Sequence, residues 1–226
     1  MANRRTVAYR SFLALVLLGS LAGLARAEES IAKLRARIAR LDSKISGLAS
    51  VVTRVEGRPG EAWVLWHLAR LHDQRAETHL HLHAVLNPPP DTSGDLVMGL
   101  VPPAEFLADR DAHETLCRRL ITRFARTSAA AKAALDLGIT HEQDHKMDEA
   151  GALYAKALEL ARDPRQVELA RFFRARWLTC RAARGKSPEG YARALELIRP
   201  VAAGTSRLTA RALYAGGGSL DERRSA

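Results

Sequence analysis

The sequence predicts an all-α protein in which an N-terminal coiled-coil helix precedes a series of helical hairpins. Three observations support this class. Ala and Leu dominate the composition, aromatic residues make up only 5% of the chain, and no stretch beyond residue 27 alternates in the way that half-buried strands do. A heptad pattern lies near the start of the chain, and a repeated helical motif lies in its second half.

The first 27 residues have the three parts of an export signal. Three arginines precede an almost uncharged apolar run at 11–24, and residues 25–27 read Ala-Arg-Ala, the pattern that signal peptidase cleaves. The apolar run is shorter than the roughly 20 residues that a membrane-spanning helix needs. We therefore predict a signal peptide at 1–27, a mature chain that starts at Glu28, and a periplasmic or secreted location. An uncleaved N-terminal anchor is the alternative.

The mature chain is mildly basic. Removal of the signal takes away four arginines and no acid, which leaves 31 basic and 25 acidic residues and a net charge of +6. This charge suits an acidic partner, but it is not concentrated enough to indicate nucleic acid. We expect no nucleic-acid partner, and no stable membrane span once the signal has been removed.

Residues 28–57 carry an unbroken heptad repeat. The a positions are all β-branched and three of the four d positions are Leu, which favours a parallel two-stranded coiled coil, although a trimer is close in energy. This pattern predicts self-association. The alternative is one amphipathic helix packed on its own domain. The seam consists of Ile31, Leu34, Ile38, Leu41, Ile45, Leu48, Val52 and Val55.

A helix and a proline-rich linker are predicted at 58–104. Arg58-Pro59-Gly60 breaks the first helix, and a second helix is predicted from Glu61 to Leu86, with Trp63 and Trp66 on its apolar face. Three consecutive prolines follow, and then several Gly and Pro residues. This composition marks the boundary between the N-terminal part and the repeats.

Residues 105–214 are regular, and residues 131–163 are the clearest part. They read AKAALDLGITHEQDHKMDEAGALYAKALELARD, and small, apolar and aromatic residues stand at the spacings of a tetratricopeptide repeat. The segment resembles that family closely, although Ala134 and His141 stand where the family usually has Trp and Tyr. The Ala-Leu-Glu-Leu motif at 157–160 recurs at 194–197, as expected of stacked hairpins. The matching residues are Leu137, Gly138, Ala150, Tyr154 and Ala157, followed by Pro164.

The resemblance implies an α-solenoid of tetratricopeptide-like hairpins whose first helices line a concave groove. With the coiled coil, the arrangement is similar to that of periplasmic Tol-associated coordinators of cell division. It implies a non-catalytic scaffold that binds another envelope or secreted protein in a groove of basic character. A merely solvated charged face is the alternative. The partner-binding residues are expected to be Lys132, Asp136, Arg171 and Arg174.

Two histidine motifs raise the alternative of metal chemistry. Residues 141–145 read His-Glu-Gln-Asp-His, the letters of H-E-x-x-H, which would suit a metal-dependent hydrolase. The charged Asp144, the lack of a third ligand and the position at a helix end count against that interpretation. A second tract at 79–83 has three histidines, of which only His79 and His83 share a helix face with His72. We expect no catalytic residue, metal or cofactor.

Two further predictions concern the cysteines and the end of the chain. Cys117 and Cys180 both stand among apolar residues at helical spacing, so both are predicted to be buried, on helices too far apart for a disulfide. Residues 215–226 are predicted to be a disordered tail. Their glycine-rich start also suggests a third hypothesis, in which the repeats are the helical accessory region of a truncated enzyme.

Overall fold

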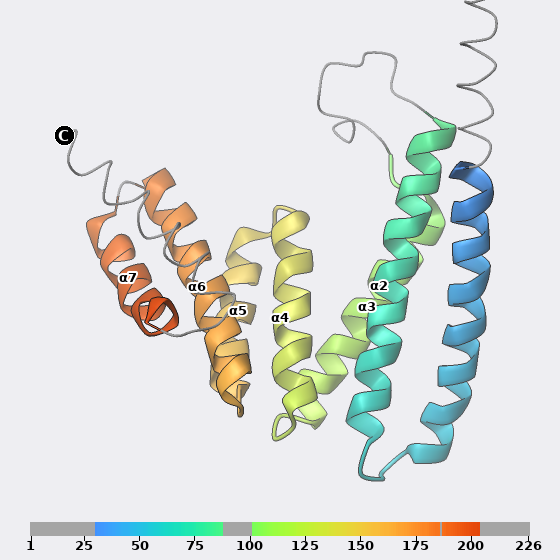
Figure 1. Ribbon diagram of the computed structural model, residues 1–226, viewed down its shortest axis with the longest axis horizontal. Helices are drawn as coiled ribbons and strands as arrows, with labels where there is room; N and C mark the ends of the chain where they lie inside the picture. The colour runs from blue at the N-terminus through green and yellow to red at the C-terminus, as the bar shows by residue number, and fades with distance from the viewer. Residues whose placement is uncertain (1–29, 88–100, 186, 204–226) are drawn as a thin grey trace, which may run out of the picture. The chain divides into compact units, whose positions relative to one another are not determined.

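The computed structural model describes residues 30–87, 101–185 and 187–203, and this part of the chain is all-helical, without strands (Figure 1). The all-α part of the predicted fold class is therefore confirmed. The second helix has the bounds that the sequence predicts, from Glu61 to Leu86. The predicted signal peptide, most of the proline-rich linker and the predicted tail lie outside the described residues. An N-terminal helix covers residues 30–55, and it is followed by α2 (Glu61–Leu86), α3 (Ala104–Arg123), α4 (Ser128–Gln143), α5 (Met147–Leu160), α6 (Pro164–Gly185) and α7 (Pro188–Ala202).

None of the helices in the described ranges combines enough length with enough apolar character to cross a bilayer.

The chain divides into two compact units. The first comprises Met1–Val51 and Arg70–Ala112, and the second comprises Val52–Ala69 and His113–Ala226, each as far as the structure describes it. Helices α2 and α3 each contribute residues to both units. The boundaries between the units therefore fall within the N-terminal helix, α2 and α3.

A buried carboxylate holds the first unit together. Asp109 on α3 is 2% exposed and accepts hydrogen bonds from Nε and Nη2 of Arg75 on α2, at 2.8 and 2.6 Å. His72 Nδ1 lies 2.7 Å from the same carboxylate, and Arg75 also donates to Asp42 on the N-terminal helix. Burial alone raises the pKa of Asp109, but the hydrogen bonds from Arg75 and His72 outweigh it and leave this pKa below its ordinary value. One guanidinium group thus joins three helices.

The second unit begins with a turn that needs glycine. Gly57 and Gly60 have φ angles of +73° and +103°, in the left-handed region where a side chain is strained. Glu61 opens α2 directly afterwards and is 1% exposed. Its two carboxylate oxygens accept hydrogen bonds from Gly57 N at 2.7 Å and from Arg119 Nη2 at 2.6 Å. The turn, α2 and α3 are therefore fixed by one buried, paired charge.

Close packing of small residues against aromatic rings joins α4, α5 and α6. A Cβ atom built on Gly138 of α4 would lie 2.7 Å from the Tyr154 ring of α5, and one built on Gly151 of α5 would lie 2.3 Å from the Trp177 ring of α6. Helix α4 packs against α5, and α5 packs in turn against α6. Only glycine at these two positions lets the rings approach the helix backbones so closely. Gly138 and Tyr154 are two of the residues that match the repeat family, and the structure packs them against each other.

Helix α7 completes the described part of the second unit by pairing with α6. Ser187 caps its start, because the side-chain oxygen accepts a hydrogen bond from Gly190 N at 3.1 Å, and Pro188 occupies the first turn. Ala175 of α6 is buried together with Ile198 and Val201 of α7, with Phe172 packed beside them. These contacts fix the last helical pair.

Candidate functional site

Two of the predicted partner-binding residues belong to an aromatic cluster at the surface of the second unit. The Lys132 ammonium on α4 lies 4.3 Å from the ring centre of Trp63 and 4.6 Å from that of Trp66, both on α2. The indole N–H of Trp66 donates to Asp136 Oδ2 at 3.0 Å. Trp63 remains 41% exposed. A lysine, a carboxylate and two indoles thus form one amphipathic patch, which we call the tryptophan patch.

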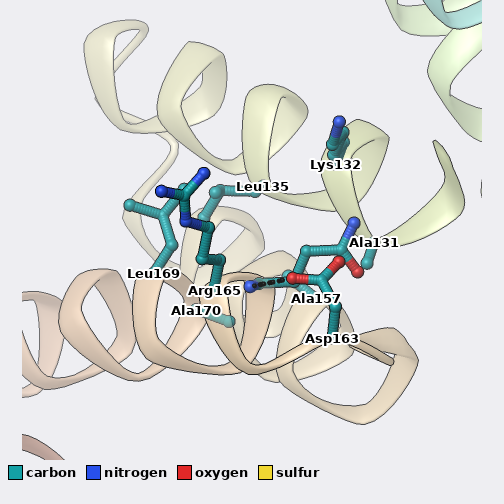
Figure 2. Close-up of a pocket in the computed structure, with 9 residues that line it drawn as sticks. Ala131, Lys132, Leu135, Ala157, Asp163, Arg165, Leu169 and Ala170 are labelled. Atoms are coloured by element: carbon teal, nitrogen blue, oxygen red, sulfur yellow. Dashed lines mark hydrogen bonds between the residues drawn. The ribbon is translucent and has the colours of Figure 1, made fainter. Parts of the chain in front are cut away.

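A pocket of about 270 Å³ opens between α4, α5 and α6, and Lys132 lies on its rim (Figure 2). Its apolar lining consists of Ala131, Leu135, Ala157, Leu169 and Ala170. Charged and polar groups complete the lining, namely Lys132, Asp163, Arg165 and Gln166. The pocket adjoins the tryptophan patch, because Lys132 belongs to both. We call this hollow the α4–α6 pocket.

Asp163 has a structural role at the edge of the α4–α6 pocket. Its Oδ1 atom accepts a hydrogen bond from Gln166 N at 2.9 Å, which satisfies an otherwise free N–H group in the first turn of α6 (Figure 2). Gln166 in turn donates from Nε2 to the carbonyl oxygen of Ser128 on α4 at 3.1 Å. These two bonds fix the start of α6 against α4 and so fix the width of the pocket.

Arg171 and Arg174 line a different pocket from the one that Lys132 lines, and the groove predicted to hold all three stays a prediction. The pocket of the two arginines has a volume of about 490 Å³ and is also lined by residues of α5 and α7. The reason for the separation lies in the helical period of α6. Arg174 donates from Nη1 to the carbonyl oxygen of Gly151 on α5, whereas Arg176 donates to Glu142 on α4. The arginine of α6 that bonds to α4 is therefore Arg176.

The H-E-x-x-H motif does not form a metal site on one helix. Helix α4 ends at Gln143, and His145 lies beyond it with a φ angle of +59°. The two histidines therefore do not stand one helical turn apart on a common face. Glu142 accepts hydrogen bonds from the Tyr154 hydroxyl and from Arg176, which links α4 to α5 and α6. Burial and this hydrogen bond raise the pKa of the Tyr154 hydroxyl.

His141 is buried at the end of α4 without a hydrogen-bond partner. Its side chain is 4% exposed, and neither ring nitrogen has a partner among the described residues. The nearest carboxylate oxygen is Glu114 Oε2, 3.6 Å from Nε2. Burial lowers the pKa of His141, and the opposing effect of Glu114 does not restore it. The imidazole is therefore neutral at pH 7.

Two histidines of α2 are also engaged in protein contacts, namely His72 and, from the histidine tract, His83. His72 bonds to Asp109 in the first unit, and His83 Nδ1 lies 3.3 Å from the amide nitrogen of Asn87. Across residues 30–87, 101–185 and 187–203, no three His, Cys, Asp or Glu side chains converge as a metal site would require.

The predicted coiled-coil seam is covered within the single chain. Leu41 and Ile45 are buried, and the other six seam residues are partly buried, whereas almost every other residue of this helix is exposed. Asp42 pairs with Arg75, so this helix lies beside α2 within the first unit (Figure 1). This is the arrangement of the alternative, an amphipathic helix packed on its own domain. Self-association through the same seam would require Leu41 and Ile45 to exchange these contacts for intermolecular ones.

The prediction that both cysteines are buried holds for Cys117 and is wrong for Cys180. Cys117 is fully buried beside His113, whereas Cys180 is exposed, and neither forms a disulfide. Cys180 follows Trp177 by three residues, but the side of α6 on which it lies is not covered by α5 or α7. Apolar spacing along one helix does not show which neighbours cover it.

Sequence reasoning placed Trp63 and Trp66 in a core and omitted Arg165 from the site. The spacing of Trp63, Trp66 and Lys132 gave no sign that the lysine lies over the rings, because the contact joins helices 66 to 69 residues apart in the chain. Comparisons with models of protein families, with curated proteins and with solved structures found no match for this chain.

Proposed function

We propose that the protein is a non-catalytic scaffold that binds a segment of another protein on the second unit. The binding surface consists of the α4–α6 pocket and the adjoining tryptophan patch. The observation that carries this proposal is the combination of a small apolar pocket with a charged rim and an indole that is 41% exposed. Tryptophan is strongly enriched among the residues that dominate the free energy of protein–protein binding.

The chemistry of the surface defines the kind of segment that it suits. The apolar lining accepts one or two aliphatic side chains, and Lys132 and Arg165 lie beside it as cations. The indole N–H of Trp66 and the carboxylate of Asp136 are already hydrogen-bonded to each other. These two residues therefore contribute to the shape of the surface more than to its available charge. A partner segment with an apolar residue next to a carboxylate therefore complements the surface. Ordering such a segment costs free energy, and we expect affinity in the micromolar range.

We further propose that the helical pairs are tetratricopeptide-like hairpins stacked as a solenoid. Three packing relations support this proposal. Helices α4 and α5 pair, α6 and α7 pair, and α4 also touches α6. The contact of Gly138 with Tyr154 supports it too, because the resemblance implies a small residue and an aromatic residue at these positions. In such a stack the surface formed by α2, α4 and α6 is the one that holds a ligand.

The place of action belongs to the same proposal. The composition of residues 1–27 supports export, so we propose that the scaffold and its partner meet in the periplasm or outside the cell. A metal-dependent hydrolase receives no comparable support, because His145 lies outside α4 and Glu142 is bound to Tyr154 and Arg176.

Site-specific photocrosslinking in cells tests this function. A photoreactive residue in place of Arg165 or Leu169 should give one discrete adduct, because both line the α4–α6 pocket. The same residue in place of Arg162 or Arg184, which are exposed and line none of the described pockets, is the control. Trp63→Ala should weaken the adduct at least fivefold while the helical circular dichroism signal is kept. Equal adducts at the control positions, or none at the pocket, would contradict the proposal.

A further inference from the structure

The second unit has another pocket, formed by α5, α6 and α7, which is lined mainly by arginines and aliphatic side chains. Its volume is about 490 Å³, within the range of pockets that hold small molecules. Its charged residues are Arg171 and Arg174 from α6 and Arg193 and Glu196 from α7. Its apolar wall consists of Ala155, Leu158, Leu178, Leu197 and Pro200. We call it the arginine pocket.

The positive charge of the arginine pocket is not neutralised within the described chain. Among residues 30–87, 101–185 and 187–203, the structure gives Arg171 and Arg193 no hydrogen bond and no ion pair. Within the same residues, Arg174 donates its hydrogen bond to a backbone carbonyl, that of Gly151. With Glu196 as the one carboxylate in the lining, the pocket carries a net charge of about +2.

A neighbouring residue holds Arg174 in place. Its guanidinium carbon lies 4.6 Å from the ring centre of Trp177, and Arg181 lies over the same ring at 5.4 Å. Arg181 is paired with Asp148, so its charge is partly satisfied elsewhere. Burial lowers the pKa of Arg174 and the nearby Arg181 lowers it further, as expected for a cation that lacks an anion. The indole and the Gly151 carbonyl oxygen thus orient a guanidinium group at the edge of the pocket.

We propose that the arginine pocket binds a phosphate monoester. Arg171, Arg174 and Arg193 hold the phosphate, and the wall of Leu158, Leu178 and Leu197 holds an apolar part of the same molecule. A phosphate monoester carries close to two negative charges at pH 7, which matches the net charge of the pocket. The planar guanidinium group donates parallel hydrogen bonds to phosphate oxygens, and three such groups from two helices can surround them. This pocket is separate from the α4–α6 pocket, so the proposal does not depend on the proposed function.

Titration of the mature chain with phenyl phosphate at low salt tests the proposal. We expect saturable binding by calorimetry, at least tenfold tighter than that of benzoate, which offers the same ring with one negative charge. Binding should strengthen between pH 5.5 and pH 7.5, since the second phosphate proton is lost near pH 6. Equal affinity for benzoate, or no saturation by phenyl phosphate, would overturn the proposal.

Variants separate this pocket from the general positive charge of the chain. Arg171→Gln with Arg193→Gln should weaken phenyl phosphate binding at least tenfold. Arg162→Gln with Arg184→Gln removes the same charge from exposed positions outside the pocket and should leave the affinity within twofold. An equal loss in both pairs would show non-specific attraction and overturn the site. Both pairs should keep the wild-type circular dichroism spectrum, because none of these four side chains is buried.

Two further arms identify the source of the phosphate. Phosphatidylcholine vesicles with 20% phosphatidic acid, a lipid phosphate monoester, should bind the chain through the same arginines if the natural ligand is a lipid. Binding of soluble phenyl phosphate without vesicle binding would support a soluble ester. Binding of an Asp- and Glu-rich peptide at this pocket without any binding of phenyl phosphate would overturn the phosphate proposal in favour of a protein segment.

Discussion

The two units of this protein are held together by different forces. In the first unit, Asp109 is buried and joined to Arg75 and His72, and Arg75 reaches Asp42. In the second unit, the centre of the α4–α6 hairpins is a set of alanines and glycines that two aromatic rings cover. The first unit thus depends on a polar network, whereas the α4–α6 part of the second unit depends on close packing.

The difference decides what each unit tolerates. A buried ion pair contributes little net free energy, but removal of one partner leaves the other charge uncompensated, so its loss is costly. Close packing around glycine is sensitive to the opposite change. An added atom destabilises it, because the neighbouring rings leave no free volume for that atom. The first unit should therefore be sensitive to deletion, and the second unit to addition.

The largest effect is expected from Asp109→Ala. The substitution leaves Arg75 partly buried with only the exposed Asp42 as a partner, and we expect a loss of about 3 kcal/mol in the free energy of unfolding. Asp111→Ala, an exposed neighbour on the same helix, is the matched control and should change this free energy by less than about 0.5 kcal/mol. Urea unfolding followed by circular dichroism measures both variants.

Tryptophan fluorescence adds a second readout to the same experiment. All three tryptophans belong to the second unit, at positions 63, 66 and 177. If the units unfold separately, Asp109→Ala should shift the circular dichroism transition and leave the fluorescence transition in place. A loss as small as that of Asp111→Ala would show that the Asp109 network does not stabilise the first unit.

The second-largest effect is expected from Gly→Ala, made at two different positions. Gly151→Ala places a methyl group 2.3 Å from the Trp177 ring, and the rearrangement should destabilise the second unit by about 1–3 kcal/mol. Gly47→Ala lies in the N-terminal helix with no neighbouring atom within 4 Å, and it should stabilise the protein by about 0.5–1 kcal/mol. Opposite signs in urea unfolding are the expected result. Equal signs would contradict the packing seen at Gly151.

The contrast between the units also explains what the sequence could predict. The helix from Glu61 to Leu86 follows from local signals, namely apolar spacing and helix-breaking residues, whereas the small residue at 138 and the aromatic residue at 154 are picked out by the resemblance to a repeat family. The Asp109–Arg75 pair joins residues that are 34 positions apart and lie on different helices. From sequence alone, a charged residue on a helix is interpreted as solvent-exposed, so this pair could not be predicted. Periodicity finds apolar faces, but it does not show which neighbour covers them or which charges meet.

The same limit applies at the candidate site. The spacing of the predicted first repeat helix draws attention to Lys132, which lines the α4–α6 pocket. Arg171 and Arg174 are on the correct helix but line a different pocket, because the side of α6 that meets α4 depends on the packing of Gln166 and Arg176. The sequence contains no local signal for the rotation of α6 about its own axis, which decides which side chains meet α4.

The smallest effect concerns His141, a buried imidazole of the second unit whose ring nitrogens make no hydrogen bond within the described residues. Its pKa is lowered in the folded chain, so the unfolded chain binds the proton more readily at mildly acidic pH. The contribution of the neutral imidazole to the free energy of unfolding is therefore fully present above the ordinary histidine pKa of about 6.5, and it decreases as the pH falls below that value. The slope from one proton is at most about 1.4 kcal/mol per pH unit. Four charged side chains act on this imidazole, namely Glu114, Arg118, Asp144 and Lys146.

His141→Leu should flatten this pH dependence and leave the stability at pH 7.5 equal or higher, because it removes two buried nitrogens that lack partners. His145→Asn removes an exposed imidazole from a left-handed position that Asn tolerates, and it should keep the wild-type slope.

Asp109 differs from His141 in the pH range in which its protonation destabilises the fold. Its lowered pKa places the corresponding loss below about pH 4, as protonation breaks its bonds to Arg75 and His72. Urea unfolding between pH 4.5 and 7.5 therefore isolates His141, and an unchanged slope in His141→Leu would show that its imidazole is already solvated in the folded chain.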